Sequence, residues 1–331
     1  MMIDIPEALV SVADVIRSHE RFVVIAHFRP DGDAIGSTIA LGHALQAMGK
    51  QVRMLNEDPV PERYAFLQGS DEIGRTPRGP VDAEVVISVD NGAWKRLGDR
   101  SVVSLANAPL VVNIDHHGSN ECFGAVNCVL PDEAATGCIL YKLIRLLEVP
   151  ITPVIANALY AAISTDTGSF QYEKTTPEVM RMAGDLLSKG VNVMEMNRML
   201  YQEVSWKSLM VTREVLNGMV LEEDGRLCWF SLDLETKGRL NASPDDVADL
   251  VDSIRVIRGV KVAAIFEEME PGVIRVSMRS KDARVNVAKI AEEFHGGGHA
   301  LAAGIRIRRP LAEARECVLQ AIRVACRKAL G

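Results

Sequence analysis

The sequence has 331 residues, 48% of them hydrophobic, and a formal net charge of −7 at pH 7. The length suggests about two domains and the composition an ordinary globular core, which excludes collagen-like, low-complexity and wholly disordered chains. The negative charge argues against a protein that coats long nucleic acid. The absence of a long apolar run and of a basic N-terminal region predicts a cytoplasmic protein with no membrane contact.

Strand-like and helix-like segments alternate in the first part of the chain, which is typical of a parallel sheet with helices on its faces. Short β-branched runs predict four strands, at residues 22–26, 52–55, 85–89 and 110–114. Helical periodicity predicts helices over 37–48, ending before Gly49, and over 153–163, beginning with Pro153. We therefore expect an α/β domain at residues 1–188, built on a doubly wound, mostly parallel sheet.

A helical pattern with a break at Gly190 covers residues 176–217, and we interpret 189–216 as a helical linker. Strands are then predicted at 227–232, 260–267, 273–279 and 305–308. Helices are predicted at 244–257, 285–294 and 311–330. This order favours a smaller C-terminal α/β domain with a mixed sheet at residues 217–331.

Acidic and histidine residues follow three of the four strands predicted in the first domain. They are His27, Asp31 and Asp33 after the first strand, Asp90 after the third, and Asp115, His116 and His117 after the fourth. Ligands bind beyond the carboxyl ends of the strands in an open α/β sheet, so we expect these side chains to converge. Asp166, which follows the helix predicted over 153–163, is a further candidate for the same place.

Five carboxylates cannot share one crevice uncompensated, because neighbouring negative charges repel at high cost. Divalent cations offset this repulsion, and oxygen and imidazole ligands without thiolates favour Mn²⁺ or Mg²⁺. A carboxylate at a strand end can bridge two metal ions, as in phosphoester hydrolysis, and Asp90 is the bridging candidate. Each motif alone has a plainer explanation: Asp33 fits a helix N-cap, for example. Histidines at two strand ends favour the metal site.

A glycine-rich segment of the second domain predicts an anion-binding loop. Three successive glycines let backbone N–H groups face an anion, and the following histidine adds a side-chain donor. An arginine at the end of a predicted strand can pair bidentately with a phosphate. The predicted substrate-binding residues are Arg279, Ser280, Gly296, Gly297, Gly298 and His299. A flexible turn is the plain alternative, and the metal motifs favour substrate binding.

Charge is unevenly distributed along the chain. Residues 271–331 contain twelve Lys or Arg and five Asp or Glu, a local charge of +7, so the first 270 residues sum to −14. This asymmetry fits metal ions in the first domain and a phosphate-binding site in the second. It also fits solubility alone, and both interpretations stay open.

These motifs together resemble the DHH phosphoesterase family. The resemblance is carried by His27–Ser37, Asp90, Asp115–His117 and Thr165–Gly168. Residues 294–304 resemble the glycine-rich signature of the DHH-associated domain, with departures from the family pattern at His295 and Ala300. The resemblance spans nearly the whole chain, whose length is most similar to the bifunctional oligoribonucleases and PAP phosphatases.

The resemblance implies two Mn²⁺ ions, for which Mg²⁺ is a substitute. The implied ligands of the first ion are His27, Asp31 and Asp90. Those of the second are Asp33, Asp90, His116 and Asp166. Asp115 would orient an imidazole and His117 would face the scissile phosphate, so these two are the catalytic candidates.

The implied activity is hydrolysis of short RNA oligonucleotides, the dinucleotides pApA and pGpG, and the 3′-phosphate of 3′-phosphoadenosine 5′-phosphate (PAP). The expected partners are therefore short oligonucleotides and a nucleoside bisphosphate, without long duplex nucleic acid, and a homodimer is left open. A cyclic di-AMP phosphodiesterase is the alternative within the class, ahead of a RecJ-like exonuclease or a pyrophosphatase. A catalytically idle nucleotide sensor is the alternative from another class, and the complete set of expected ligands disfavours it.

Overall fold

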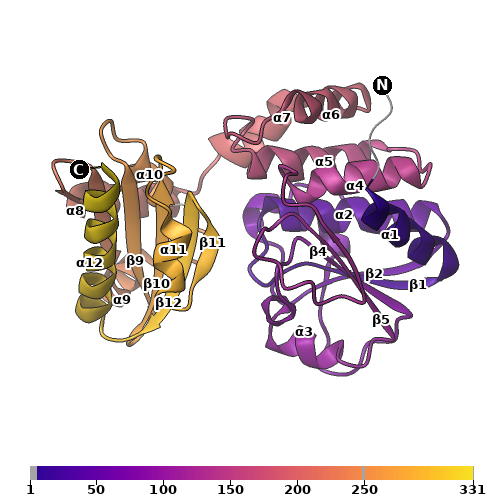
Figure 1. Ribbon diagram of the computed structural model, residues 1–331, viewed down its shortest axis with the longest axis horizontal. Helices are drawn as coiled ribbons and strands as arrows, with labels where there is room; N and C mark the ends of the chain where they lie inside the picture. The colour runs from indigo at the N-terminus through magenta and orange to yellow at the C-terminus, as the bar shows by residue number, and fades with distance from the viewer. Residues whose placement is uncertain (1–5, 248–249, 331) are drawn as a thin grey trace. The chain divides into compact units, whose positions relative to one another are not determined.

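The computed structural model describes residues 6–247 and 250–330, and the chain divides into two compact units between Glu203 and Val204. Figure 1 shows that each unit has its own sheet and helices. Helix α7 (Val193–Asn197) and the π-helical turn η4 (Arg198–Gln202) belong to the first unit, and α8 (Trp206–Gly218) to the second. Within the two described stretches, no helix is both long enough and apolar enough to cross a bilayer.

Six parallel strands form the sheet of the first unit, in the order β3-β2-β1-β4-β5-β6. They are β1 (Arg21–Ile25), β2 (Gln51–Asn56), β3 (Gly74–Arg75), β4 (Val85–Val89), β5 (Leu110–Asp115) and β6 (Val126–Val129). The four predicted strands are thus confirmed to within one residue. The strand order reverses between β1 and β4, and open α/β sheets bind ligands at the carboxyl ends of the strands at such a point.

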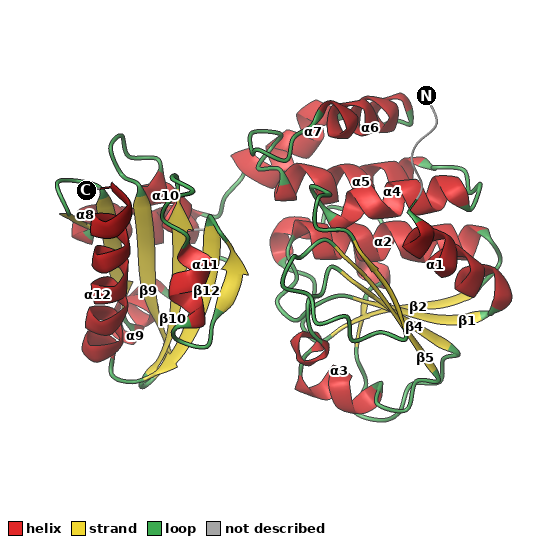
Figure 2. Ribbon diagram, viewed as in Figure 1, coloured by secondary structure: helices red, strands yellow, loops and turns green. Residues whose placement is uncertain are grey.

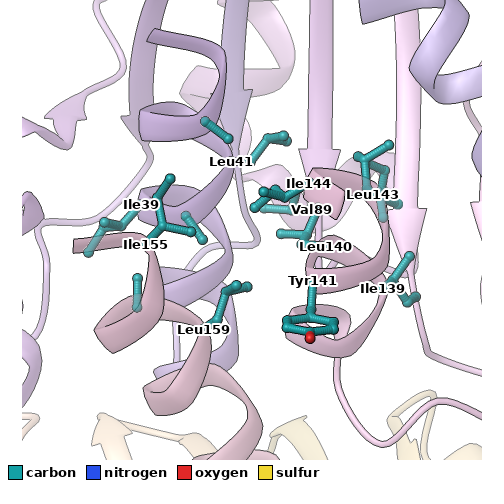
Figure 3. Close-up of a cluster of buried hydrophobic side chains, with 14 of the residues drawn as sticks. Ile39, Leu41, Val89, Ile139, Leu140, Tyr141, Leu143, Ile144, Ile155 and Leu159 are labelled. Atoms are coloured by element: carbon teal, nitrogen blue, oxygen red, sulfur yellow. The ribbon is translucent and has the colours of Figure 1, made fainter. Parts of the chain in front are cut away.

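Helices cover both faces of this sheet (Figures 1 and 2). One face carries α1 (Glu7–Ser18), α2 (Gly32–Ala47), α4 (Thr136–Leu146) and α5 (Pro153–Asp166), with α6 (Pro177–Ser188) packed on α4 and α5. The other carries α3 (Asp99–Ser104) and the 3₁₀ turn η3 (Trp94–Leu97). Two further 3₁₀ turns are η1 (Glu62–Tyr64) and η2 (Ser70–Glu72). Figure 3 shows apolar side chains of α2, α4 and α5 gathered in the larger core.

Helices α2 and α5 approach each other closely because α2 presents glycine where they cross. A Cβ on Gly36 would lie 2.4 Å from the carbonyl oxygen of Ala158, a separation that real Cβ atoms do not reach. A side chain at this position would therefore push the two helices apart. The contact matters for the site, since α2 begins beside Asp31 and α5 ends with Asp166.

The second unit has a mixed six-stranded sheet in the order β11-β12-β10-β9-β8-β7. Its strands are β7 (Val220–Glu222), β8 (Leu227–Leu232), β9 (Val262–Glu270), β10 (Val273–Ser280), β11 (Gly297–His299) and β12 (Ala302–Arg308). Only β8 and β9 pair in parallel. One face packs against α8, α9 (Leu234–Leu240) and α10 (Leu250–Arg255), and the other against α11 (Val287–Glu292) and α12 (Leu311–Leu330). An α/β fold with a mixed C-terminal sheet is confirmed.

The glycine-rich segment differs from the loop that the sequence predicted. Gly297 and Gly298 lie in β11, which pairs with β12. Gly298 has a φ of +139°, and a Cβ there would lie 2.4 Å from the carbonyl oxygen of Ala302. The glycine is therefore required by the close approach of two strands, a requirement that a sequence cannot distinguish from loop flexibility.

Four predicted helices have other bounds. The helix expected over 37–48 is α2, which begins five residues earlier at Gly32, and the helix expected over 285–294 is the shorter α11. The helix expected over 153–163 continues to Asp166, so this carboxylate lies in the last turn of α5 and not beyond the helix. The helix expected over 244–257 is the shorter α10, and residues 248–249 of that prediction lie outside the described residues. Helices α1, α3, α4 and α9 and strands β3, β6, β7 and β11 were not predicted.

Candidate active site

Asp90, directly after β4, lies at the centre of the side chains that follow β1, β4 and β5. Its Oδ2 is 3.5 Å from Nε2 of His27, and its Oδ1 is 3.6 Å from Nε2 of His116 and 3.7 Å from Nδ1 of His117. The residue is 1% exposed. One buried carboxylate therefore faces three imidazoles that the chain delivers from two different strand ends.

The first group of potential ligands consists of His27, Asp31 and Asp90, whose ligand atoms all lie within 4.8 Å of one another. The Nδ1–H of His27 donates to the carbonyl of Phe28 at 2.8 Å, which directs Nε2 toward the two carboxylates. Asp31 also caps α2 by accepting from the N–H of Ala34. The capping role and the ligand role are thus compatible in one side chain.

The second group consists of Asp33, Asp90 and His116, again within 4.8 Å. Nε2 of His116 is 3.0 Å from Oδ2 of Asp166, so the last turn of α5 joins this group. The structure therefore brings together all six residues expected to bind metal, and Asp90 is shared by both groups.

Asp33 is held by the first turn of α4. It accepts hydrogen bonds from the N–H of Thr136 at 2.6 Å, the N–H of Gly137 at 2.9 Å and the hydroxyl of Ser37 at 3.0 Å. Anions are favoured at a helix N-terminus, where backbone N–H groups lack partners within the helix. These donors were not predicted from the sequence. Thr136 and Gly137 precede an apolar helical period, which was a signal for the start of α4.

His117 is oriented by a carboxylate. Its Nδ1–H donates to Oδ1 of Asp115 at 2.7 Å, and Oδ2 of Asp115 accepts from the side-chain amide of Asn120 at 2.5 Å. Asp115 is fully buried at the end of β5. Asn120 was not predicted, because it follows the histidine motif within an irregular loop.

The imidazoles of the site strongly favour their charged forms in the absence of metal. Burial alone would lower the pKa of His27, but Asp31 and Asp90 outweigh it and raise that pKa to about 10. Burial opposes the charged form of His116 too, and nearby carboxylates, Asp166 foremost, raise its pKa to about 10. This cluster of side chains therefore favours positive charge at its centre.

The carboxylates are of two kinds. Burial opposes ionisation in each, but nearby imidazoles outweigh it and lower the pKa values of Asp31 and Asp90, whereas the pKa values of Asp33 and Asp166 are raised. Burial and the negative charges of Asp90 and Asp166 raise the pKa of Asp33 well above its ordinary value. A carboxyl group that accepts three hydrogen bonds and still resists ionisation lies among too many negative charges. Divalent cations would relieve this crowding, and the oxygen and imidazole donors fit Mn²⁺ or Mg²⁺.

The predicted substrate-binding residues lie in the second unit. Arg279 is the penultimate residue of β10, and its Nε lies 3.6 Å from Oδ2 of Asp252. Ser280 ends the strand, and its hydroxyl donates to the carbonyl of Asp282 at 2.9 Å. His299 ends β11 and is exposed. His295 has a φ of +59°, a left-handed conformation in which glycine has no steric cost.

A strand order of 3-2-1-4-5-6 with carboxylates and imidazoles gathered at its reversal point fits a metal-dependent hydrolase of phosphate esters. The DHH family, N-terminal domain, matches residues 21–163, and the DHHA1 domain matches residues 230–328. The chain belongs to the DHH family of phosphoesterases and is a hydrolase acting on ester bonds.

Known proteins resemble the chain over nearly its whole length. The bifunctional oligoribonuclease and PAP phosphatase NrnA of Thermus thermophilus is 35% identical over 320 residues, which cover 94% of this chain and 92% of the relative. An exopolyphosphatase-related protein from Bacteroides fragilis superposes with a TM-score of 0.88 at 26% identity, covering 98% of each chain. RecJ from Thermus thermophilus, in complex with Mn²⁺, shares the fold with a TM-score of 0.56 at 14% identity, covering 99% of this chain and 56% of RecJ.

Proposed function

We propose that this chain is a Mn²⁺-dependent oligoribonuclease that hydrolyses short RNA, pApA and pGpG to mononucleotides and also converts PAP to AMP. The observation that carries the proposal is the position of Asp90, itself buried, between two groups of potential ligands. The substrate classes rest on the NrnA relative, whose name states both activities. The choice of Mn²⁺ rests on the donor set and on the ion bound to RecJ.

In this proposal, residues 1–188 are the catalytic domain, 189–216 the linker and 217–331 the substrate-binding domain. One ion would be held by His27, Asp31 and Asp90, and the other by Asp33, Asp90, His116 and Asp166. When bound, such a pair supplies Lewis acidity toward the phosphoryl oxygens. The side chains that bind the ions must be in position before substrate binds. The hydrogen bonds from α4 would hold Asp33 in this position.

His117 and Asp115 form the second part of the proposed machinery. We assign His117 to contact with the scissile phosphate, because its Nδ1–H is committed to Asp115 and the ring orientation is therefore set. Asp115 is in turn held by Asn120. Asp115 acts as a positioning residue, in the way that a buried carboxylate orients a catalytic histidine elsewhere.

Arg279, Gly296 to Gly298 and His299 are the proposed contacts to the nucleotide. Ser280 contributes differently, because its hydroxyl both donates to the carbonyl of Asp282 and accepts from the N–H of Asp282. It therefore fixes the end of the strand that carries Arg279. We assign Ser280 to positioning this arginine.

The test is a rate comparison on pApA, pGpG, PAP, cyclic di-AMP and a five-nucleotide RNA, each with Mn²⁺, Mg²⁺ or EDTA. We expect mononucleotide release from the linear substrates and AMP from PAP, fastest in Mn²⁺ and absent in EDTA. Faster hydrolysis of cyclic di-AMP than of every linear substrate would replace the proposal with the cyclic dinucleotide alternative. Binding of nucleotides without any turnover would favour a sensor.

A further inference from the structure

One face of the second sheet carries rows of cationic side chains. In an antiparallel sheet, directly opposed residues lie on the same face. The register pairs His299 with Ala302 and Ala302 with Arg279, which forms one row across β11, β12 and β10. Residues two positions further along each strand return to this face, roughly 6.8 Å away.

The same face continues into a second cationic region. Arg306 of β12 is opposite Arg275 of β10, and Arg308 is opposite Val273. Arg306 and Arg308 are exposed, and among the described residues neither forms an ion pair or a hydrogen bond. We call Arg275, Arg279, Arg306 and Arg308 the cationic face.

The acidic groups near this face are already engaged. Glu267, which is 3% exposed, lies opposite Arg275 on β9, with its carboxylate 2.5 Å from Nη2 of Arg275 and 2.7 Å from Nζ of Lys237. Asp252 of α10 is shared between Arg279 and Arg255. Positive charge therefore remains in surplus where β12 is open to solvent.

The surplus lies on Arg306 and Arg308. Arg275 is directly opposite Arg306, but Glu267 already compensates its charge. Helices α8, α9 and α10 pack on β8, β9 and β10, and the residues of β12 on this face stay open. An anion that lies across β12 would compensate the two arginines of that strand.

Small residues separate the two cationic regions. The row between them consists of Gly297, Gly304 and Ser277. Glycine leaves bare backbone at this point, so a bulky group can lie directly on the strands. The face thus alternates cationic side chains with small residues.

We propose that Arg306 and Arg308 of the cationic face bind the phosphates of later nucleotides in a short RNA whose terminal nucleotide is held by Arg279 and His299. The inference rests on the proposed function and deepens it, because it assigns the residues that distinguish an oligonucleotide from PAP. PAP has no second nucleotide to reach Arg306. The two arginines are therefore specificity residues for oligonucleotides.

The test measures binding of a fluorescent five-nucleotide RNA to the full chain in EDTA, over a range of KCl concentrations. The variants are Arg306→Gln/Arg308→Gln and, as a matched control, Lys289→Ala/Lys328→Ala. Both control residues are exposed lysines of α11 and α12, which cover the opposite face. Circular dichroism and Tm establish that each variant is folded.

We expect the arginine double variant to bind this RNA about tenfold more weakly, through loss of two charged phosphate contacts. Its slope of log K against log salt should fall by about 1.4, at about 0.7 for each contact to a single strand. In Mn²⁺, its kcat/KM on the pentanucleotide should drop similarly, while that on PAP stays within twofold.

Three outcomes would overturn the inference: equal binding by the arginine variant and the wild type, equal loss in the lysine control, or no measurable binding of RNA by the wild type. Failure of the proposed function has a different signature. In that case the wild type would bind the pentanucleotide through these arginines and hydrolyse none of it.

Discussion

At the scale of single residues, Asp90 combines an unusual backbone with the central place in the site. Its φ is +52°, in the left-handed region that non-glycine residues other than Asn and Asp seldom adopt. Its N–H donates to the carbonyl of Ile114 at 3.0 Å, and its Oδ1 accepts from the hydroxyl of Thr136 at 3.2 Å. Strained conformations persist where the surroundings over-determine them, and these contacts hold the carboxylate between the two ligand groups.

Replacing Asp90 by Asn tests the shared carboxylate with little change of shape, because Asn tolerates the same backbone conformation. We expect Asp90→Asn to lower kcat/KM at least about 100-fold, since even outer partners of metal ligands are worth about 10- to 100-fold. Saturating Mn²⁺, at 100 times its Kd, should stabilise the wild type by about 2.7 kcal/mol and the variant by much less.

Thermal melts with and without Mn²⁺ provide the measurement, and Asp71→Asn in the exposed turn η2 is the control. A folded Asp90→Asn protein that keeps a wild-type Mn²⁺ shift and more than a tenth of the activity would contradict the two-group assignment.

The gathering of the acidic and histidine side chains was predictable because parallel strands end at one edge of their sheet. The donors that hold Asp33 were not predictable in the same way. They are backbone N–H groups of Thr136 and Gly137, more than 100 residues away in sequence, and every residue type except proline has such a group. Only the three-dimensional placement of α4 identifies them.

At the scale of elements, the crossing of α2 and α5 controls the distance between the ligands that the two helices carry. Gly36→Ala introduces a Cβ against backbone at Ala158. We expect a loss of about 1–3 kcal/mol in the free energy of unfolding, as for other overpacked cores, together with reduced activity. Urea denaturation and kcat/KM provide the measurements.

Gly184→Ala is the matched control for this prediction. Gly184 is exposed in α6, and a Cβ there would meet nothing within 4 Å. The substitution should stabilise the protein by up to about 1 kcal/mol through helix propensity. If both alanine variants changed stability alike, the close crossing would not be the cause.

The N-terminus of α3 depends on Glu57. Its carboxylate accepts from the N–H of Arg100 at 3.2 Å and from the N–H and hydroxyl of Ser101, both at 2.8 Å. Burial favours the neutral acid, but the hydrogen bonds from Ser101 and Arg100 outweigh it and lower the pKa of Glu57 below its ordinary 4.5. The charged form therefore stabilises the fold above pH 4.5, and this contribution is lost as pH falls through the lowered pKa.

We expect Glu57→Gln to lower the stability by about 1 kcal/mol at pH 7, as for loss of a helix cap. The difference from wild type should shrink as the pH falls through the folded pKa. Denaturation at a series of pH values measures it, with Glu121→Gln on an exposed loop as the control. A difference that stays constant across that range would show that the charge of Glu57 is not involved.

The strands were easier to predict than some of the helices. Strands β1, β4 and β5 have both faces covered and therefore consist of continuous β-branched and apolar runs. Helix α4 was missed because it begins among small residues and no side-chain cap marks its N-terminus. Strand β11 was missed because glycine is unusual inside a strand, and only the close contact of Gly298 with β12 explains it there.

At the scale of the whole molecule, charge is divided along the chain. The first 270 residues sum to −14 and the last 61 to +7. The cationic face of the second unit extends over only a few rows of the sheet, so it offers no continuous path for a long strand. Phosphates beyond its reach would meet a mostly acidic protein, at a cost that salt reduces.

We therefore expect a five-nucleotide RNA to be hydrolysed at least tenfold faster per end than a 24-nucleotide RNA at low salt, with a smaller ratio at high salt. An end-labelled RNA ladder at fixed Mn²⁺ and two KCl concentrations measures the ratio. Equal rates at both salt concentrations would indicate an open cleft that accepts strands of any length.

The reversal of strand order between β1 and β4 also determines when the sheet can assemble during translation. β1 emerges first among the strands but lies in the middle of the sheet, so it must wait for β2 on one side and β4 on the other. At ~5–20 residues per second, about 7 to 28 seconds separate the translation of His27 from that of Asp166. During this interval the early acids lack both the N–H donors of α4 and the last turn of α5. The growing chain therefore cannot assemble the complete set of proposed ligands before the ribosome has passed residue 166.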